Sequence, residues 1–238
     1  MNHSDSGTIM PDSFTFAAHA ERDERATFIS KTYIHLAGAI AAFVAFEAVL
    51  LSLPFTPRLV ETMIGGRFSW LIVLGAFMAV SWIANSWARS ATSLSTQYMG
   101  LGLYVVAQAI IMVPLLYIAQ RFHSGIIATA GITTLGLFAV LTTVVFVTRK
   151  DFSFLRSVLI FGGFAAFGLI ACGILFNFAL GPIFTYAMIA LACGYILYDT
   201  SNIMLHYRTT QYVAASLALF ASVALLFWYV LQLFMSRD

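Results

Sequence analysis

Two carboxylates lie inside stretches of sequence that are otherwise almost entirely apolar. Glu47 falls within residues 34–53, and Asp199 ends the stretch at residues 180–199. An ionisable side chain in a membrane-spanning segment is costly, and such residues commonly mark sites for ions, protons or substrates. These two residues are the first candidates for chemistry. Each residue could instead have a purely structural role: Asp199 could accept hydrogen bonds only from backbone groups at a helix end, and Glu47 could reach water.

The composition indicates that these stretches cross a membrane. Only 9% of the 238 residues are charged, 61% are hydrophobic, and the mean hydropathy is +0.91. A soluble domain carries about 25% charged residues, so an ordinary soluble enzyme and a disordered chain are excluded. The net charge of +2 lacks the basic character of a nucleic-acid binder. The sequence contains no motif for a nucleophile, a phosphate loop or a zinc site, and we expect neither an enzyme nor a cofactor.

Seven stretches are long enough to cross the hydrocarbon core of a bilayer, which takes roughly 20 apolar residues. None of them alternates with a period of two, so the sequence predicts an all-α bundle of seven transmembrane helices and not a barrel. Residues 1–32 are expected to form a cytoplasmic, largely disordered tail, which turns helical near residues 21–31, and residues 33–238 the membrane domain. The predicted spans are residues 34–53, 70–87, 99–118, 126–147, 157–176, 180–199 and 213–235.

The basic residues predict the orientation of the chain. Lys and Arg are enriched in the cytoplasmic flanks of spanning helices. Eight of the twelve flank the side that carries the amino terminus, which we therefore expect to be cytoplasmic. Glu47 then lies ~9 Å from the outer edge, and Asp199 lies ~10–13 Å from the cytoplasmic interface if its helix continues past residue 199.

Three other polar residues lie where they could meet these carboxylates. Arg89 follows the second span on the cytoplasmic side, and its long side chain could reach Asp199. Tyr195 lies one turn before Asp199 and could donate a hydrogen bond to it. Gln108 lies inside the third span, where it could line a pore or join two helices by hydrogen bonds.

The chain resembles the Bax inhibitor family of transmembrane Bax-inhibitor-motif proteins at two motifs and in its layout. Residues 148–155 read TRKDFSFL, similar to the family's basic turn between the fourth and fifth spans. Residues 194–200 read GYILYDT, similar to the family's Leu-Tyr-Asp-Thr stretch. The seven-span layout, with Pro114 late in the third span, also matches.

This resemblance implies a function for the buried aspartate. A bacterial branch of the family is a pH-sensitive calcium leak, in which aspartates on the sixth and seventh spans share a proton and gate the pore. In the closed state the first of these pairs with a basic residue at the end of the second span, the place that Arg89 holds here. The chain departs from the family at Ser222, which stands where the second aspartate belongs, on a helix antiparallel to that of Asp199.

Two functions from different classes are therefore expected. The first is an ion-conducting leak or permease of the bacterial inner membrane, passing calcium or protons, with a gate and pH sensor at Asp199, Arg89 and Ser222. Glu47, Tyr195 and Gln108 are its candidate pore-lining residues. The second is a non-conducting modulator of a membrane-anchored AAA quality-control protease, contacted through the tail. The lipid bilayer is the partner in both cases, and the sequence defines no metal site.

Overall fold

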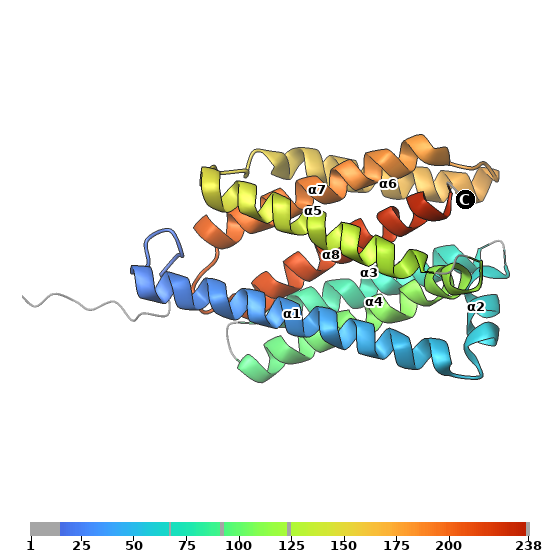
Figure 1. Cartoon of the computed structure of the whole chain (residues 1–238), viewed down its shortest axis with the longest axis horizontal. Helices are drawn as coiled ribbons and strands as arrows, with labels where there is room; N and C mark the ends of the chain where they lie inside the picture. The colour runs from blue at the N-terminus through green and yellow to red at the C-terminus, as the bar shows by residue number, and fades with distance from the viewer. Residues whose placement is uncertain (1–14, 67, 91–92, 123–124, 237–238) are drawn as a thin grey trace, which may run out of the picture.

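The computed structural model describes residues 15–66, 68–90, 93–122 and 125–236, and they form a bundle of helices (Figure 1). Eight helices are present among these residues, and seven of them are long and apolar enough to cross a membrane. In chain order they are α1 (Arg22–Ser52), α2 (Thr56–Ile64), α3 (Ser69–Ala88), α4 (Leu94–Phe122), α5 (Ile126–Thr148), α6 (Leu155–Phe176), α7 (Gly181–Leu205) and α8 (Tyr212–Met235).

The seven-span prediction is confirmed, and the helices extend beyond the predicted spans. Helix α7 continues from Asp199 to Leu205, as the depth assigned to Asp199 requires. Helix α4 begins at Leu94, before the apolar stretch starts. A helix satisfies its own backbone hydrogen bonds, so it continues past the apolar core until a capping residue or a turn ends it.

Helix α2 was not predicted from the sequence. It has only nine residues, begins with Pro57 in its first turn and buries Thr56, Val60 and Met63 against the bundle. A helix this short is too short to span a bilayer and gives no signal to a search for long apolar stretches. It lies at the end of the bundle where α1 ends and α3 begins (Figure 1).

The predicted boundary between tail and membrane domain falls inside α1, because this helix begins at Arg22. Phe28 and Thr32 are buried. Ahead of the helix, the Ala17 amide donates a hydrogen bond of 2.9 Å to the Tyr207 carbonyl in the loop between α7 and α8. Residues 15–32 therefore pack against the bundle, and residues 1–14 of the predicted tail lie outside the described residues.

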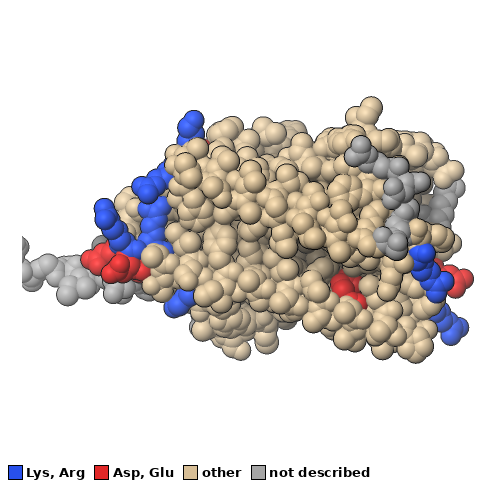
Figure 2. Space-filling view, in the orientation of Figure 1, with Lys and Arg blue, Asp and Glu red and all other residues tan. Residues whose placement is uncertain are grey.

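Helix α8 lies at the centre of the bundle. It packs against α1, α4, α5 and α7, and more of its residues are buried than in the other helices described (Figure 1). Helix α3 packs chiefly against α4, and α6 packs against α7. Lys and Arg residues lie at the two ends of the long axis, and uncharged residues cover most of the band between them, which shows one small acidic patch (Figure 2). This distribution is typical of a protein with its apolar band in lipid.

Candidate functional site at the α7–α8 contact

The site forms where α7 and α8 run antiparallel, and it contains Asp199 and Ser222. The Ser222 hydroxyl donates a hydrogen bond of 2.5 Å to Oδ2 of Asp199. Ser222 is buried, and Asp199 is partly buried. Ser222 lies ten residues after the start of α8, ~15 Å along the helix, which is about halfway across a core of ~30 Å. The expectation that the two positions face each other is thus met by a direct contact.

Arg89 lies within electrostatic reach of this site. It caps the carboxyl end of α3, and its side chain is exposed. Its charge acts on both Asp199 and Tyr207. Of the described residues, Asp199 and Arg89 form no ion pair with each other. Arg89 therefore acts on Asp199 through its charge. The hydrogen bond that joins Asp199 on α7 to α8 comes from Ser222.

The Asp199 charge acts on three tyrosines. Tyr104 on α4, Tyr195 on α7 and Tyr207 after α7 all lie within electrostatic reach of Asp199. Burial, followed by the nearby Asp199 charge, raises the pKa of Tyr207 to about 12. The Tyr207 hydroxyl is therefore neutral and protonated at physiological pH.

The predicted hydrogen bond from Tyr195 to Asp199 is wrong. The Tyr195 hydroxyl instead donates a bond of 2.9 Å to the carbonyl of Leu159 on α6. Spacing along one helix placed Tyr195 beside Asp199, but a long side chain can turn toward a neighbouring helix, whose backbone offers a strong acceptor. Tyr195 thus fixes α6 against α7 at the edge of the site.

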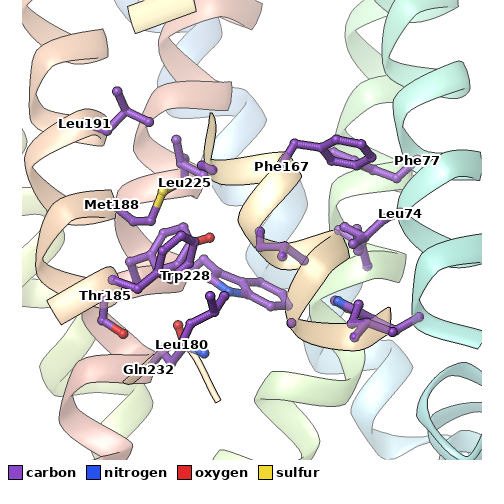
Figure 3. Close-up of a pocket in the computed structure, with 18 of the residues that line it drawn as sticks. Leu74, Phe77, Phe167, Leu180, Thr185, Met188, Leu191, Leu225, Trp228 and Gln232 are labelled. Atoms are coloured by element: carbon purple, nitrogen blue, oxygen red, sulfur yellow. The ribbon is translucent and has the colours of Figure 1, made fainter. Parts of the chain in front are cut away.

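A cavity of about 1120 Å³ adjoins the Asp199–Ser222 contact (Figure 3). It lies between α3 and α4 on one side and α6, α7 and α8 on the other, and Ser222, Tyr195 and Gln108 all line it. Figure 3 shows Trp228 near its centre, with Leu74 and Phe77 across from Met188 and Leu225. Of the predicted pore-lining residues, Tyr195 and Gln108 are therefore placed at this cavity.

Glu47 lies apart from this site. It is on α1, five residues before the end of the helix, and it is not among the residues that line the cavity. Its side chain is only 4% exposed, and neither carboxylate oxygen has a hydrogen-bond partner. The alternative in which Glu47 reaches water is therefore wrong for this conformation, and Glu47 does not supply a second carboxylate beside Asp199.

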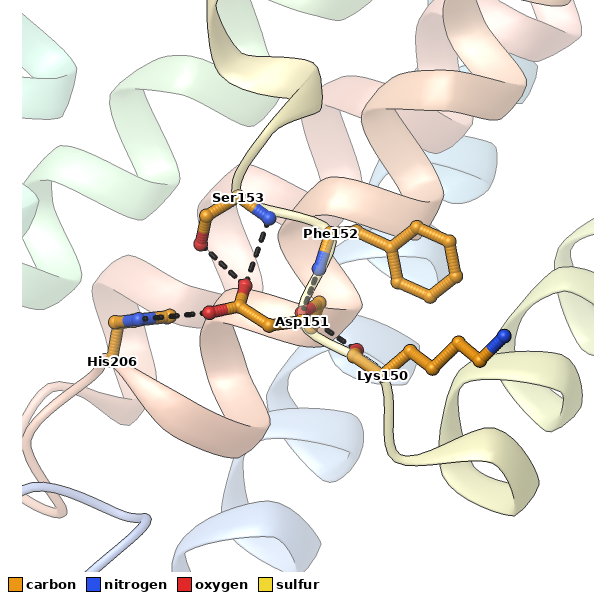
Figure 4. A network of polar contacts seen from close by, with 6 residues as sticks. Lys150, Asp151, Phe152, Ser153 and His206 are labelled. Atoms are coloured by element: carbon orange, nitrogen blue, oxygen red, sulfur yellow. Dashed lines mark hydrogen bonds and ion pairs between the residues drawn. The ribbon is translucent and has the colours of Figure 1, made fainter.

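The carboxyl-terminal end of α7 holds a polar network that the sequence did not reveal (Figure 4). The Ser201 hydroxyl accepts a bond of 3.0 Å from the Phe152 amide and donates one of 3.3 Å to the Lys150 carbonyl. Asp151 lies 3.6 Å from His206 and accepts two bonds from Ser153. The motif at residues 148–155 is thus docked on the end of the helix that carries Asp199. The KDFS segment of this motif drew attention to the loop from the sequence alone. Nothing in the sequence indicated that the Ser201 hydroxyl would form hydrogen bonds with the backbone of this loop.

In the part of the chain that the structure describes, no three His, Cys, Asp or Glu residues lie together as a metal site would need. Asp199 is a single carboxylate, and its hydrogen-bond partner is the Ser222 hydroxyl. A hard dication prefers six to eight oxygen ligands.

Seven spanning helices around a partly buried, hydrogen-bonded aspartate define a multi-pass membrane protein. The family model described as inhibitor of apoptosis-promoting Bax1 matches residues 25–238, and the chain belongs to this family.

Three relatives extend this finding. An uncharacterized protein of Pseudomonas aeruginosa is 27% identical and aligned over 92% of this chain and 93% of its own length. Bax inhibitor 1 of Schizosaccharomyces pombe is 34% identical, over 47% of this chain and 43% of its own length. Protein LIFEGUARD 4 of Arabidopsis thaliana is 27% identical, over 89% and 85%. The resemblance inferred from the two motifs is confirmed.

Proposed function

We propose that this protein is a pH-sensitive ion leak, passing calcium or protons, whose gate is the contact between Asp199 and Ser222. The observation that carries the proposal is the hydrogen bond of 2.5 Å that joins α7 to α8 at one end of the cavity. A polar contact at mid-membrane depth is costly to bury and is expected where ions or protons move. Separating α7 from α8 there would extend the cavity toward the cytoplasmic end of the bundle.

Protonation of Asp199 is the proposed trigger. The ionised carboxylate accepts a charge-assisted hydrogen bond from Ser222 and is attracted by the Arg89 guanidinium. A proton on Asp199 removes both the charge attraction and the charge assistance, so the closed arrangement loses stability relative to an open one. Ion flux is therefore expected to rise as pH falls.

We further propose the bacterial inner membrane as the location, with the amino terminus in the cytoplasm. Figure 1 shows that four parts of the chain lie at one end of the bundle: the start of α1, the end of α3, the loop from α5 to α6 and the loop from α7 to α8. Eight of the twelve Lys and Arg residues belong to that end by sequence. The rule that positive charge stays inside supports this orientation.

The proposal is tested by flux in proteoliposomes that enclose a calcium-sensitive dye, with proton flux followed in parallel by a pH-sensitive dye. Wild type should leak more at acidic pH, and Asp199→Asn should flatten the pH profile because its amide does not titrate. Asp151→Asn is the matched control, since it removes a carboxylate in the exposed loop and should leave the profile unchanged. Wild-type flux no greater than that of empty vesicles at any pH would overturn the proposal.

A further inference from the structure

The cavity beside the gate has a chemistry that suits an amphiphile better than it suits water. Its middle is apolar and aromatic, and the described residues that line it include no charged side chain. Trp70 and Trp228 stack within it, with ring centroids 5.9 Å apart and planes inclined by 23°. An apolar cavity excludes water and can bind an apolar ligand. When it is empty, the side chains of its wall lack the dispersion contacts that a ligand would provide.

Polar groups lie at the two ends of the cavity. Ser222, Tyr195 and Gln108 line the end near the gate, while Thr185 and Gln232 line the other end. Figure 3 shows Thr185 and Gln232 below Trp228, with Phe77 and Leu191 toward the opposite end. These outer groups are hydroxyls and amides, which pair with uncharged carbonyl or hydroxyl groups.

The part of the cavity between Ser222 and Gln232 corresponds in length to the hydrocarbon of one leaflet of a bilayer. Ser222 and Gln232 lie ten residues apart on α8, which is ~15 Å of helix. The hydrocarbon core of a bilayer is ~30 Å thick, so one leaflet accounts for ~15 Å. Because Ser222 lies about halfway along α8 and Gln232 near its outer end, the cavity spans the depth of the outer leaflet.

The cavity reaches the surface of the bundle that faces lipid. Phe167 on α6 lines it and is also 39% exposed. Its neighbours Phe161 and Phe164 on the same helix are exposed apolar residues. Helix α6 packs against α7, and α3 packs against α4. Small residues on α6, among them Gly163 and Ala166, widen the space between these two pairs. A lipid chain in the surrounding bilayer can thus enter from the side of α6.

We infer that this cavity binds one acyl chain of an outer-leaflet phospholipid, with the uncharged ester region of the lipid at Thr185 and Gln232. The terminal methyl group lies toward Ser222, and the aromatic wall of Trp70 and Trp228 holds the chain. Bilayer lipid is the occupant because the cavity has the depth, the apolar middle and the lateral rim that an acyl chain requires. The inference goes beyond the proposed conduction and does not depend on it.

The test is quenching of tryptophan fluorescence in vesicles of phosphatidylcholine with brominated acyl chains. The chain has four tryptophans, and Trp82→Phe/Trp87→Phe removes the two exposed on α3, leaving Trp70 and Trp228. We expect strong quenching in this background. Ala166→Phe, which fills the cavity from α6, should lose most of that quenching. Ala187→Phe, at an exposed position of α7 outside the cavity, should keep it.

Two further arms keep the inference falsifiable. Ala224→Phe fills the cavity from α8 and replaces Ala166→Phe if that variant does not fold. Mass spectrometry of the detergent-purified wild type should find retained phospholipid that the cavity-filled variant lacks. Absence of quenching in the two-tryptophan background would overturn the inference. Quenching that survives filling of the cavity would do the same, because it would come from lipid on the outer surface.

Discussion

The electrostatics of the site depend on Ser222 as much as on Asp199, because a hydroxyl faces the carboxylate where a second carboxylate could stand. Two carboxylates in contact take up protons as one coupled unit, in two separate steps. Here the partner of Asp199 is a hydroxyl that donates to it, so the contact contains one titratable carboxylate and not two. The family resemblance implies a shared proton at this position, and the residue present replaces it with a hydrogen bond.

Ser222→Asp should restore a coupled pair. We expect the pH profile of ion flux to change from one step to two, because two adjacent carboxylates resist simultaneous ionisation. Ser222→Ala is the control that removes the hydrogen bond without adding charge, and it should raise flux over the whole pH range. Both are measured in the proteoliposome assay. A profile for Ser222→Asp that superimposes on wild type would show that Asp199 and Ser222 do not form the gate.

Ser153 favours the ionised form of Asp151, in the loop between α5 and α6 that contacts the end of α7. The hydroxyl and the backbone amide of Ser153, in that order of effect, lower the pKa of Asp151, and His206 adds a smaller contribution. A carboxylate with a lowered pKa stabilises the folded loop above its ordinary pKa. That contribution is lost as pH falls through the lowered value. Because Asp151 is exposed, solvent screens the effect.

Ser153→Ala should therefore raise the pKa of Asp151 toward that of an ordinary aspartate. The titration can be followed by NMR of aspartate labelled at the carboxyl carbon, in nanodiscs. Ser157→Ala, an exposed serine at the start of α6, is the control and should leave the pKa unchanged. An unchanged pKa in Ser153→Ala would mean that the backbone amide alone holds the carboxylate.

Helices α3 and α4 approach so closely that one position tolerates only glycine. A Cβ atom at Gly100 would lie 2.6 Å from the Ala84 carbonyl oxygen and 2.6 Å from the Ala88 amide nitrogen, both backbone atoms of α3. Backbone atoms cannot rotate away as a side chain can. Gly100, Ala84 and Ala88 thus form a contact of small residues, the means by which membrane helices approach most closely.

Gly100→Ala should consequently destabilise the bundle by about 1–3 kcal/mol, the usual cost of overpacking. Gly102→Ala is the matched control, because it lies on the same helix with nothing within 4 Å of its Cβ position. It should be neutral or stabilising by up to about 1 kcal/mol, since alanine favours helix over glycine. Thermal denaturation in detergent measures both. Equal melting temperatures for the two variants would contradict the close contact.

The elements were more predictable than the contacts between them. The length and apolarity of each span are local properties, so the sequence predicted all seven of the spanning helices described here. It also predicted that Asp199 and Ser222 face each other, since counting residues from the interface gives depth in antiparallel helices. Helix α2 was missed because nine residues give no span signal. The direction of Tyr195 was missed because it depends on the neighbouring helix, and so was the docking of residues 150–153 on Ser201.

In the whole molecule, the proposed gate and the cavity meet at Ser222, and this junction connects the two proposals. If ions cross the cavity, a lipid chain bound there and an ion in transit would occupy the same space. Occupancy by lipid would therefore oppose conduction, and opening of the α7–α8 contact would require the chain to withdraw or move aside. Lipid and conduction would then shift the population between two mutually exclusive states of one cavity.

Ala166→Phe distinguishes whether the cavity is an ion path as well as a lipid site. Ala166 is buried on α6 and lines the cavity, so a phenylalanine there fills space that both occupants need. If ions cross the cavity, flux in proteoliposomes should fall severalfold at every pH while the pH of half-maximal flux stays the same, because Asp199 is untouched. Ala187→Phe should conduct as wild type does.

If Ala166→Phe loses lipid quenching but keeps full flux, the cavity binds lipid and the ions take another route past Asp199. If quenching and flux fall together, the same cavity binds lipid and conducts ions. Ion flux should then be higher in bilayers whose lipids fill the cavity less well.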